Sequence, residues 1–169
     1  MAFSSTEQLT TSGILLPKDA CIIIVRTEWN AAIVDLLEAG CISTLKENKV
    51  SYKIIKVPGA FEIGFAINAY WENHKHKTDK PNAFIALGCV LKGDTPHFEY
   101  VCNAVTNNIA DLNIALTVPV IFGVLTVNTQ SQADERTGGI HGHKGEEAAV
   151  TAMKMAALSH SLSRVNKKF

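Results

Sequence analysis

Short apolar segments alternate with amphipathic ones along most of the chain. Four of them are predicted strands, at residues 21–25, 52–57, 83–91 and 119–127. Three are almost continuously apolar, which is typical of parallel strands that are covered on both faces. The segment at 52–57 alternates more between polar and apolar residues, so we expect it at an edge of the sheet.

Between the strands, apolar residues recur every three or four positions, which is the spacing of one helix face. The first helix should follow Asn30, a residue suited to capping it, and a second should centre on residues 63–71. A third should carry the apolar residues between 98 and 112, with Pro96 in its first turn, and a last helix is expected at about 145–162. In the first helix, the expected buried stripe is Ile33, Leu36, Leu37, Gly40 and Cys41.

Strands that alternate with helices predict right-handed βαβ units, and therefore a parallel sheet with helices on both faces. The predicted fold is a three-layer α/β/α sandwich of flavodoxin-like character, with a four-stranded parallel sheet. Residues 19–169 would form its single domain and residues 1–18 an N-terminal arm. At 169 residues, the chain is long enough for one such domain and too short for two ordinary ones.

Composition argues against several classes of partner. Sixteen basic residues balance sixteen acidic ones, so no net charge favours nucleic acid or an anionic membrane. The apolar runs are far shorter than the about 20 residues of a membrane-spanning helix, and the first residues lack the features of a signal peptide. The cysteines show no CxxC spacing, so we expect buried, reduced thiols in the cytoplasm and no metal site; they are Cys21, Cys41, Cys89 and Cys102.

In such a sheet the ligand site lies beyond the carboxyl ends of the strands. After the third predicted strand, the sequence KGDT at 92–95 leads into the helix that starts near Pro96. Backbone N–H groups at a helix start can bind phosphate, and Gly93 allows the backbone to come close. His97 in the first turn could transfer a proton near pH 7, although it could instead cap the helix or pack against it.

Aromatic residues follow the first two predicted strands, Trp29 in RTEWN and Phe61 in PGAFEI. Phe61 alone would more often be a core residue, but the pair could form a platform for a planar heterocycle. Further along, Arg136 and Lys144 lie in a segment with four glycines, ERTGGIHGHKGEE. This segment could bind an anion, or it could be a solvated turn. Its two histidines lack a third ligand, so zinc is not expected.

These segments, taken in order, resemble lumazine synthase, the 6,7-dimethyl-8-ribityllumazine synthase family of riboflavin biosynthesis. The matching segments are RTEWN, VPGAFEI, ALGCVLKGDTPHFEYV, VPVIFGVLT and the ERTGG and HKG parts of the tail. The resemblance implies a cofactor-free transferase that condenses 5-amino-6-(D-ribitylamino)uracil with 3,4-dihydroxy-2-butanone 4-phosphate. Phosphate and water are released in this penultimate step of the pathway.

The resemblance also implies roles for individual residues. His97 corresponds to the family's proton-transferring histidine, and Trp29 to an aromatic residue that stacks on the pyrimidine. Arg136 corresponds to the phosphate-binding arginine, and Phe122 to a residue contributed by an adjacent subunit. The other expected contacts are Ala60, Phe61, Glu62, Cys89, Val90 and Leu91 around the pyrimidine and its ribityl chain, and Asp94, Thr95 and Lys144 on the phosphate side.

Finally, the resemblance implies a homo-oligomer of pentamers, with active sites shared between adjacent subunits and riboflavin synthase as a candidate partner. Only seven residues separate Arg136 from Lys144, and so short a turn should not obstruct contact between pentamers. This favours a closed icosahedral shell of about sixty subunits, with a decamer as the main rival. Residues 2–18 could add a strand to a neighbour's sheet. The alternative function is a flavin-binding, lumazine-binding or shell-forming homologue without turnover.

Overall fold

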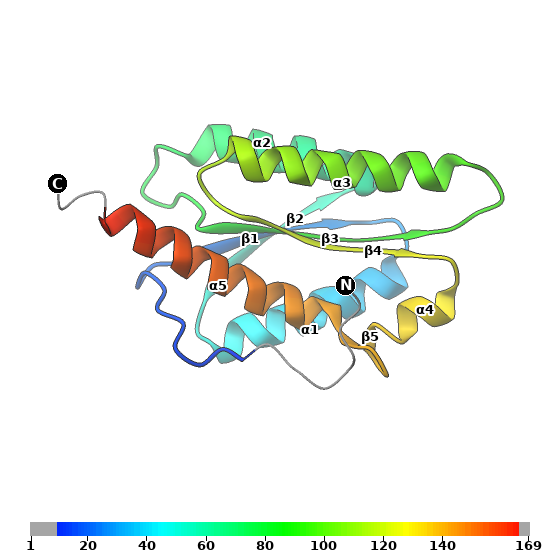
Figure 1. The fold of residues 1–169 in the computed structure, drawn as a ribbon, viewed down its shortest axis with the longest axis horizontal. Coiled ribbons are helices and arrows are strands. Elements are labelled where there is room, and N and C mark those ends of the chain that lie inside the picture. The colour runs from blue at the N-terminus through cyan, green and yellow to red at the C-terminus, as the bar shows by residue number, and fades with distance from the viewer. Residues whose placement is uncertain (1–9, 166–169) are drawn as a thin grey trace.

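A computed structural model describes residues 10–165 of the chain as a four-stranded parallel sheet between two layers of helices (Figure 1). The strands are hydrogen bonded in the order β2-β1-β3-β4. All four predicted strands are present, and β2 lies at an edge of the sheet, as its alternating pattern predicts. Their bounds are Cys21–Thr27 for β1, Ser51–Val57 for β2, Ala83–Leu91 for β3 and Val120–Val127 for β4.

The four predicted helices are also present, close to their expected positions. They are α1 Ala31–Glu47, α2 Ile63–His74, α3 His97–Ala115 and α5 Lys144–Val165. A single 3-10 turn, η1 (Ala60–Glu62), leads into α2. The sequence did not predict the short helix α4 (Gln130–Asp134) or the hairpin of β5 (Thr137–Gly139) and β6 (Gly142–His143). No helix within residues 10–165 is long and apolar enough to cross a membrane.

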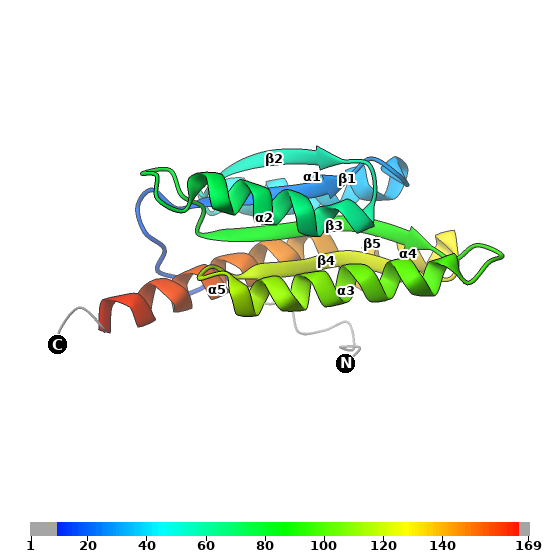
Figure 2. The same cartoon turned by 90° about the horizontal axis from the view of Figure 1, so that it is seen from above.

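The sheet separates two hydrophobic cores. Ile22 and Ile24 of β1 pack on the side of α1 and α5, whereas Ile23 and Val25 pack on the side of α2 and α3. Successive side chains of a strand point to opposite faces, so a strand covered on both sides must be apolar throughout. This arrangement, visible in Figures 1 and 2, is the predicted flavodoxin-like three-layer sandwich.

The expected apolar stripe of α1 is only partly correct. Ile33, Leu37 and Cys41 are buried, but Leu36 remains 47% exposed. Leu36 directly precedes Leu37, so it points to the side of the stripe rather than into the core. Spacing alone marks the apolar side of a helix without fixing how much of that side its neighbours cover.

Arg26, near the end of β1, is a buried cation that fixes the start of the candidate site. Its guanidinium donates hydrogen bonds to Asp35 and Glu38 of α1 and to the carbonyl oxygen of Thr27. Burial lowers the pKa of Arg26, but these carboxylate hydrogen bonds outweigh it, and the pKa is raised overall. The network ties the end of β1 to α1 and so holds the turn between them.

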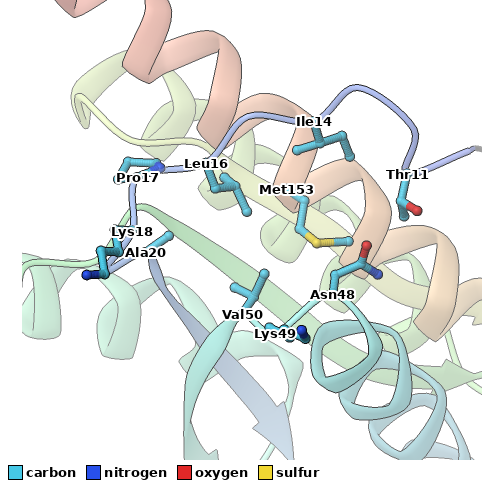
Figure 3. Close-up of a pocket in the computed structure, with 10 residues that line it drawn as sticks. All are labelled: Thr11, Ile14, Leu16, Pro17, Lys18, Ala20, Asn48, Lys49, Val50 and Met153. Carbon is cyan, nitrogen blue, oxygen red and sulfur yellow. The ribbon is translucent and has the colours of Figure 1, made fainter.

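The described part of the predicted arm packs on its own chain. Ile14 and Leu16 lie against the core on the α5 side, near Met153 (Figure 3). Beneath them is a cavity of about 240 Å³, which also reaches Ala20 and Val50. Those two residues directly precede β1 and β2, so the cavity lies at the amino ends of the strands, away from the predicted ligand site. Residues 1–9 of the arm lie outside the described residues.

Candidate active site

The carboxyl ends of the four parallel strands lie at one end of the sheet (Figure 2). There, the turns after β1 and β2 continue the pairing of the strands. Glu28 N–H donates to the Val57 carbonyl at 2.8 Å, and Trp29 N–H donates to the Pro58 carbonyl at 3.0 Å. The RTEWN and PGAFE segments therefore form one hydrogen-bonded surface. Trp29 and Pro58, which join them, are 29 residues apart in the sequence.

Both predicted platform rings are exposed at this end of the sheet. Trp29 is 66% exposed and Phe61 is 59% exposed. Phe61 is therefore not a core residue. The indole of Trp29 lies over Gly59, where a methyl group would come within 2.6 Å of ring atoms Cε3 and Cζ3. A glycine at this position is what allows the indole to approach the turn. Two exposed aromatic side chains at neighbouring strand ends could bind a planar ring.

The turn after β2 is fixed by Glu62. Its carboxylate oxygen Oε2 accepts a hydrogen bond of 3.0 Å from the Gly59 N–H, at the start of η1. Ala60, inside this turn, is buried. One carboxylate oxygen of Glu62 is therefore engaged in holding the turn that presents Phe61.

Asn30 occupies the N-cap position of α1, as the sequence suggested, but its side chain does not cap the helix. Its backbone is left-handed, with φ of 57°, and its side chain makes no capping hydrogen bond. Instead, Nδ2 donates to the carbonyl oxygen of Cys89 at 2.8 Å. Asparagine tolerates the left-handed region better than most residues, which frees its amide for this long-range contact. The contact joins the turn after β1 to the end of β3.

The end of β3 supplies the next predicted contacts. Cys89 is buried, and burial raises the pKa of its thiol to about 11. The thiol is therefore neutral near pH 7 and does not act as a nucleophile there. Val90 and Leu91 are half-buried at the mouth of the sheet. Any ligand that binds at this strand end would contact apolar side chains and backbone atoms.

The turn between β3 and α3 contains the predicted proton-transfer and phosphate residues. Asp94, Thr95 and His97 are all exposed, and α3 begins at His97, directly after Pro96. Within residues 10–165, the His97 imidazole makes no hydrogen bond. The first N–H groups of a helix lack partners inside the helix and carry partial positive charge. An anion and a proton-transferring ring can therefore both be accommodated here.

A second group of predicted residues lies along β4, the other edge strand. Phe122 is 42% exposed and lines a groove of about 350 Å³, together with Lys144 and Glu147. The Lys144 N–H donates to the carbonyl oxygen of Arg136 at 2.8 Å, across the base of the β5–β6 hairpin. The structure thus brings the two predicted cations together.

Both cations have partners within the chain. Lys144 Nζ lies 2.7 and 2.8 Å from the two carboxylate oxygens of Glu147. Nη1 of Arg136 donates to the Gln132 carbonyl at 2.8 Å and lies 3.7 Å from Glu135 Oε2. Neither side chain is fully exposed, so the loop is a structured hairpin rather than the solvated turn considered above. Lys144 would have to leave Glu147 in order to bind an anion directly.

The predicted residues therefore form two groups on one chain. No hydrogen bond or ion pair within residues 10–165 joins Phe122, Arg136 or Lys144 to the group around Trp29 and His97. In the same part of the chain, no cluster of three or more His, Cys, Asp or Glu side chains is placed to hold a metal ion.

Comparison with known proteins shows the family to which the chain belongs. The family model described as 6,7-dimethyl-8-ribityllumazine synthase matches residues 19–160. The chain belongs to this family. A relative of that name from Porphyromonas gingivalis is 53% identical over 93% of this chain and 96% of its own length. Another, from Bacteroides fragilis, is 46% identical over 83% of this chain and 97% of its own length.

The expected family and enzyme class are thus confirmed: the chain is a transferase of the riboflavin biosynthesis pathway. The sequence analysis did not predict three supporting contacts. They are the contact of Gly59 with the indole of Trp29, the hydrogen bond of Asn30 to the end of β3, and the ion pair of Glu147 with Lys144. Glu147 had a usable signal, because it lies three residues after Lys144 on a helix, where opposite charges meet. Contacts of Gly59 and Asn30 depend on the sheet order, which the sequence did not supply.

Proposed function

We propose that this lumazine synthase family member condenses 5-amino-6-(D-ribitylamino)uracil with 3,4-dihydroxy-2-butanone 4-phosphate. The products would be 6,7-dimethyl-8-ribityllumazine, phosphate and water. The observation that carries the proposal is the exposure of Trp29, Phe61 and His97 where the strands end, with no hydrogen-bond partner for the His97 imidazole within residues 10–165. A flat aromatic substrate and a proton transfer are both served by that arrangement.

The pyrimidine would bind at the strand ends that carry Trp29 and Phe61. Trp29 would stack on it and Phe61 would lie beside it, with Ala60 and Glu62 near the ribityl chain. The end of β3 would contact the ring through Cys89, Val90 and Leu91. Holding two small molecules in register removes much of the entropic barrier to a condensation, so tight positioning is the first contribution expected of these residues.

His97 would move protons during the reaction. The 5-amino group attacks the ketone, and loss of water gives a Schiff base. Removal of the C3 proton then expels phosphate and leaves an enol, which tautomerises to a new ketone at C3. The ribitylamino nitrogen attacks that ketone, and loss of a second water closes the ring. Each addition and elimination requires proton transfer, and an imidazole is suited to this near neutral pH.

The phosphate would bind beside the start of α3. Backbone N–H groups around Gly93 and Thr95 would bind it, with the Asp94 carboxylate turned away. Arg136 can hold a phosphate with two parallel hydrogen bonds, and Lys144 can add a point charge. These charges would stabilise the leaving group as the C–O bond breaks.

Each site would be completed by an adjacent subunit. Within residues 10–165, no hydrogen bond or ion pair links the group of Phe122, Arg136 and Lys144 to His97, and the group lies beside the edge strand β4. We propose that, in a pentamer, β4 and the residues beside it face the strand ends of a neighbour, where Trp29 and His97 lie. Active sites at subunit contacts make the oligomer obligatory for turnover.

Pentamers are further proposed to form a closed icosahedral shell, because the hairpin between Arg136 and Lys144 is short. Light scattering and electron microscopy would test this, and particles no larger than a pentamer at micromolar concentration would contradict it. Riboflavin synthase, which would use the product, is included as a candidate partner to be tested by co-elution. The free cysteines fit a reducing cytoplasm as the place of action.

The proposed reaction is tested by mixing both substrates with the purified protein and recording the fluorescence of the lumazine. Product should form only when both substrates and the protein are present. The competing hypothesis is a flavin- or lumazine-binding homologue without turnover, for which the aromatic platform alone would suffice. A yellow chromophore that survives purification, together with no product formation, would favour that hypothesis.

A further inference from the structure

The imidazole of His143 lies in a notch on α1 that only a glycine provides. His143 ends β6, and its ring packs against the backbone of Gly40, in the middle of α1. A methyl group at Gly40 would lie 2.6 Å from both ring nitrogens and closer still to Cε1. Nδ1 of the ring is buried and has no hydrogen-bond partner within residues 10–165. Packing alone therefore holds the ring in place.

The same turn of α1 also receives the start of α5. Gly145 lies so close to Leu37 that a methyl group there would come within 2.8 Å of the Leu37 carbonyl carbon. Leu37 is fully buried, and Arg26 fixes its helix through Asp35 and Glu38. The hairpin is thus fastened to a rigid part of the fold on both sides of Lys144.

His143 stands between the two cations of the hairpin. It directly precedes Lys144, and its cross-strand partner is Thr137, which directly follows Arg136. The hydrogen bond from Lys144 N–H to the Arg136 carbonyl closes the same pair of strands. A shift of the imidazole would therefore move the backbone that carries both cations.

The geometry points to His143 as a positioning residue for phosphate binding: its imidazole, seated against Gly40, sets the placement of Arg136 and Lys144. This inference rests on the proposed phosphate role of those two side chains. It assigns His143 no contact with substrate and no proton transfer. The role predicts a selective effect, on phosphate binding and not on the pyrimidine.

The test compares His143→Ala, Gly40→Ala and the double variant with the unaltered protein. The matched control is His141→Ala, which removes an exposed imidazole from the same hairpin whose nearest charged partner is Glu135 at 3.6 Å. Affinity for inorganic phosphate is measured by titration calorimetry, and KM for each substrate by steady-state kinetics. Calorimetry does not need turnover, so a failure of the proposed reaction would be recognised separately.

His143→Ala should weaken phosphate binding and raise KM for the butanone phosphate by about ten-fold, with KM for the pyrimidine changed by less than about two-fold. Gly40→Ala should do the same, because the methyl group displaces the ring. In the His143→Ala background the added methyl group has no ring to displace, so the double variant should be no weaker than either single variant.

Three results would overturn the inference. They are unchanged phosphate affinity in His143→Ala, effects of the two substitutions that simply multiply in the double variant, and an equal loss in His141→Ala. If Gly40→Ala alone does not fold while the double variant does, the clash with the imidazole is confirmed directly. If neither folds, the comparison of His143→Ala with His141→Ala decides.

Discussion

The indole of Trp29 lies over the backbone of Gly59, within the space that a methyl group at that position would need. Together with the hydrogen bond from Trp29 N–H to the Pro58 carbonyl, this contact joins the turns that follow β1 and β2. It fixes part of the indole and leaves 66% of the residue exposed. The indole is thus packed against the turn and remains accessible for the stacking proposed above.

Binding of the pyrimidine substrate should therefore change tryptophan fluorescence. The chain has two tryptophans, and Trp71 is buried on α2, as predicted from its helical spacing. Trp29→Phe should abolish the ligand-induced change, while the control Trp71→Phe should retain it. An intact signal in Trp29→Phe would show that the platform is assigned to the wrong residue.

His97→Ala should lower kcat far more than it raises KM, because proton transfer contributes mainly in the transition state. A loss on the order of 100-fold is expected. Steady-state kinetics with both substrates would measure it, with His76→Ala as an exposed histidine control near the end of α2. The proton-transfer role would be refuted by an unchanged kcat.

Arg136→Lys should raise KM for the butanone phosphate by about ten-fold and leave KM for the pyrimidine nearly unchanged. Lysine keeps the charge, but it loses the paired hydrogen bonds of a guanidinium and the contact with the Gln132 carbonyl. Separate titration of the two substrates distinguishes this result from general damage. An equal loss for both substrates would argue against selective phosphate binding.

The buried thiols should resist alkylation in the folded protein. Burial raises the pKa of Cys89 to about 11 and, with a smaller contribution from Glu38, that of Cys41 to about 12. Below those pKa values both thiols stay protonated in the fold, whereas unfolded thiols ionise around pH 9.0. The contribution of these thiols to the free energy of unfolding is therefore fully present below about pH 9. It is lost as pH rises from there through the raised pKa values.

Iodoacetamide at pH 8, followed by peptide mass spectrometry, would test this. Cys89 and Cys41 should be modified slowly until urea is added, and the half-buried Cys102 should react sooner. Complete modification of Cys89 and Cys41 in the folded protein would contradict their described burial.

The sequence predicted the layers of this fold because burial on both faces leaves a clear mark. Strands such as β3, with seven successive buried residues from Ala83 to Cys89, have to be apolar at every position. The β5–β6 hairpin left no such mark. It is short, polar and rich in glycine, and what defines it is contact with Gly40, about a hundred residues earlier in the chain.

The candidate site was predicted in its residues but not in its arrangement. Family motifs identified Trp29, His97 and Arg136, since each lies in a matched segment. They did not show that Asn30 binds the end of β3 or that Glu147 holds Lys144. Those contacts depend on sheet order and on side-chain direction, which local spacing does not fix.

The central claim is that His97 of one chain works with Arg136 of a neighbour, and mixed oligomers test it most directly. His97→Ala and Arg136→Ala proteins, each of low activity, are unfolded together in equal amounts and refolded. Random mixing places intact partners side by side at about one contact in four, so lumazine formation should recover to about a quarter of the unaltered rate. If the mixture is no more active than the two variants refolded separately, the site lies within one chain and the account is wrong.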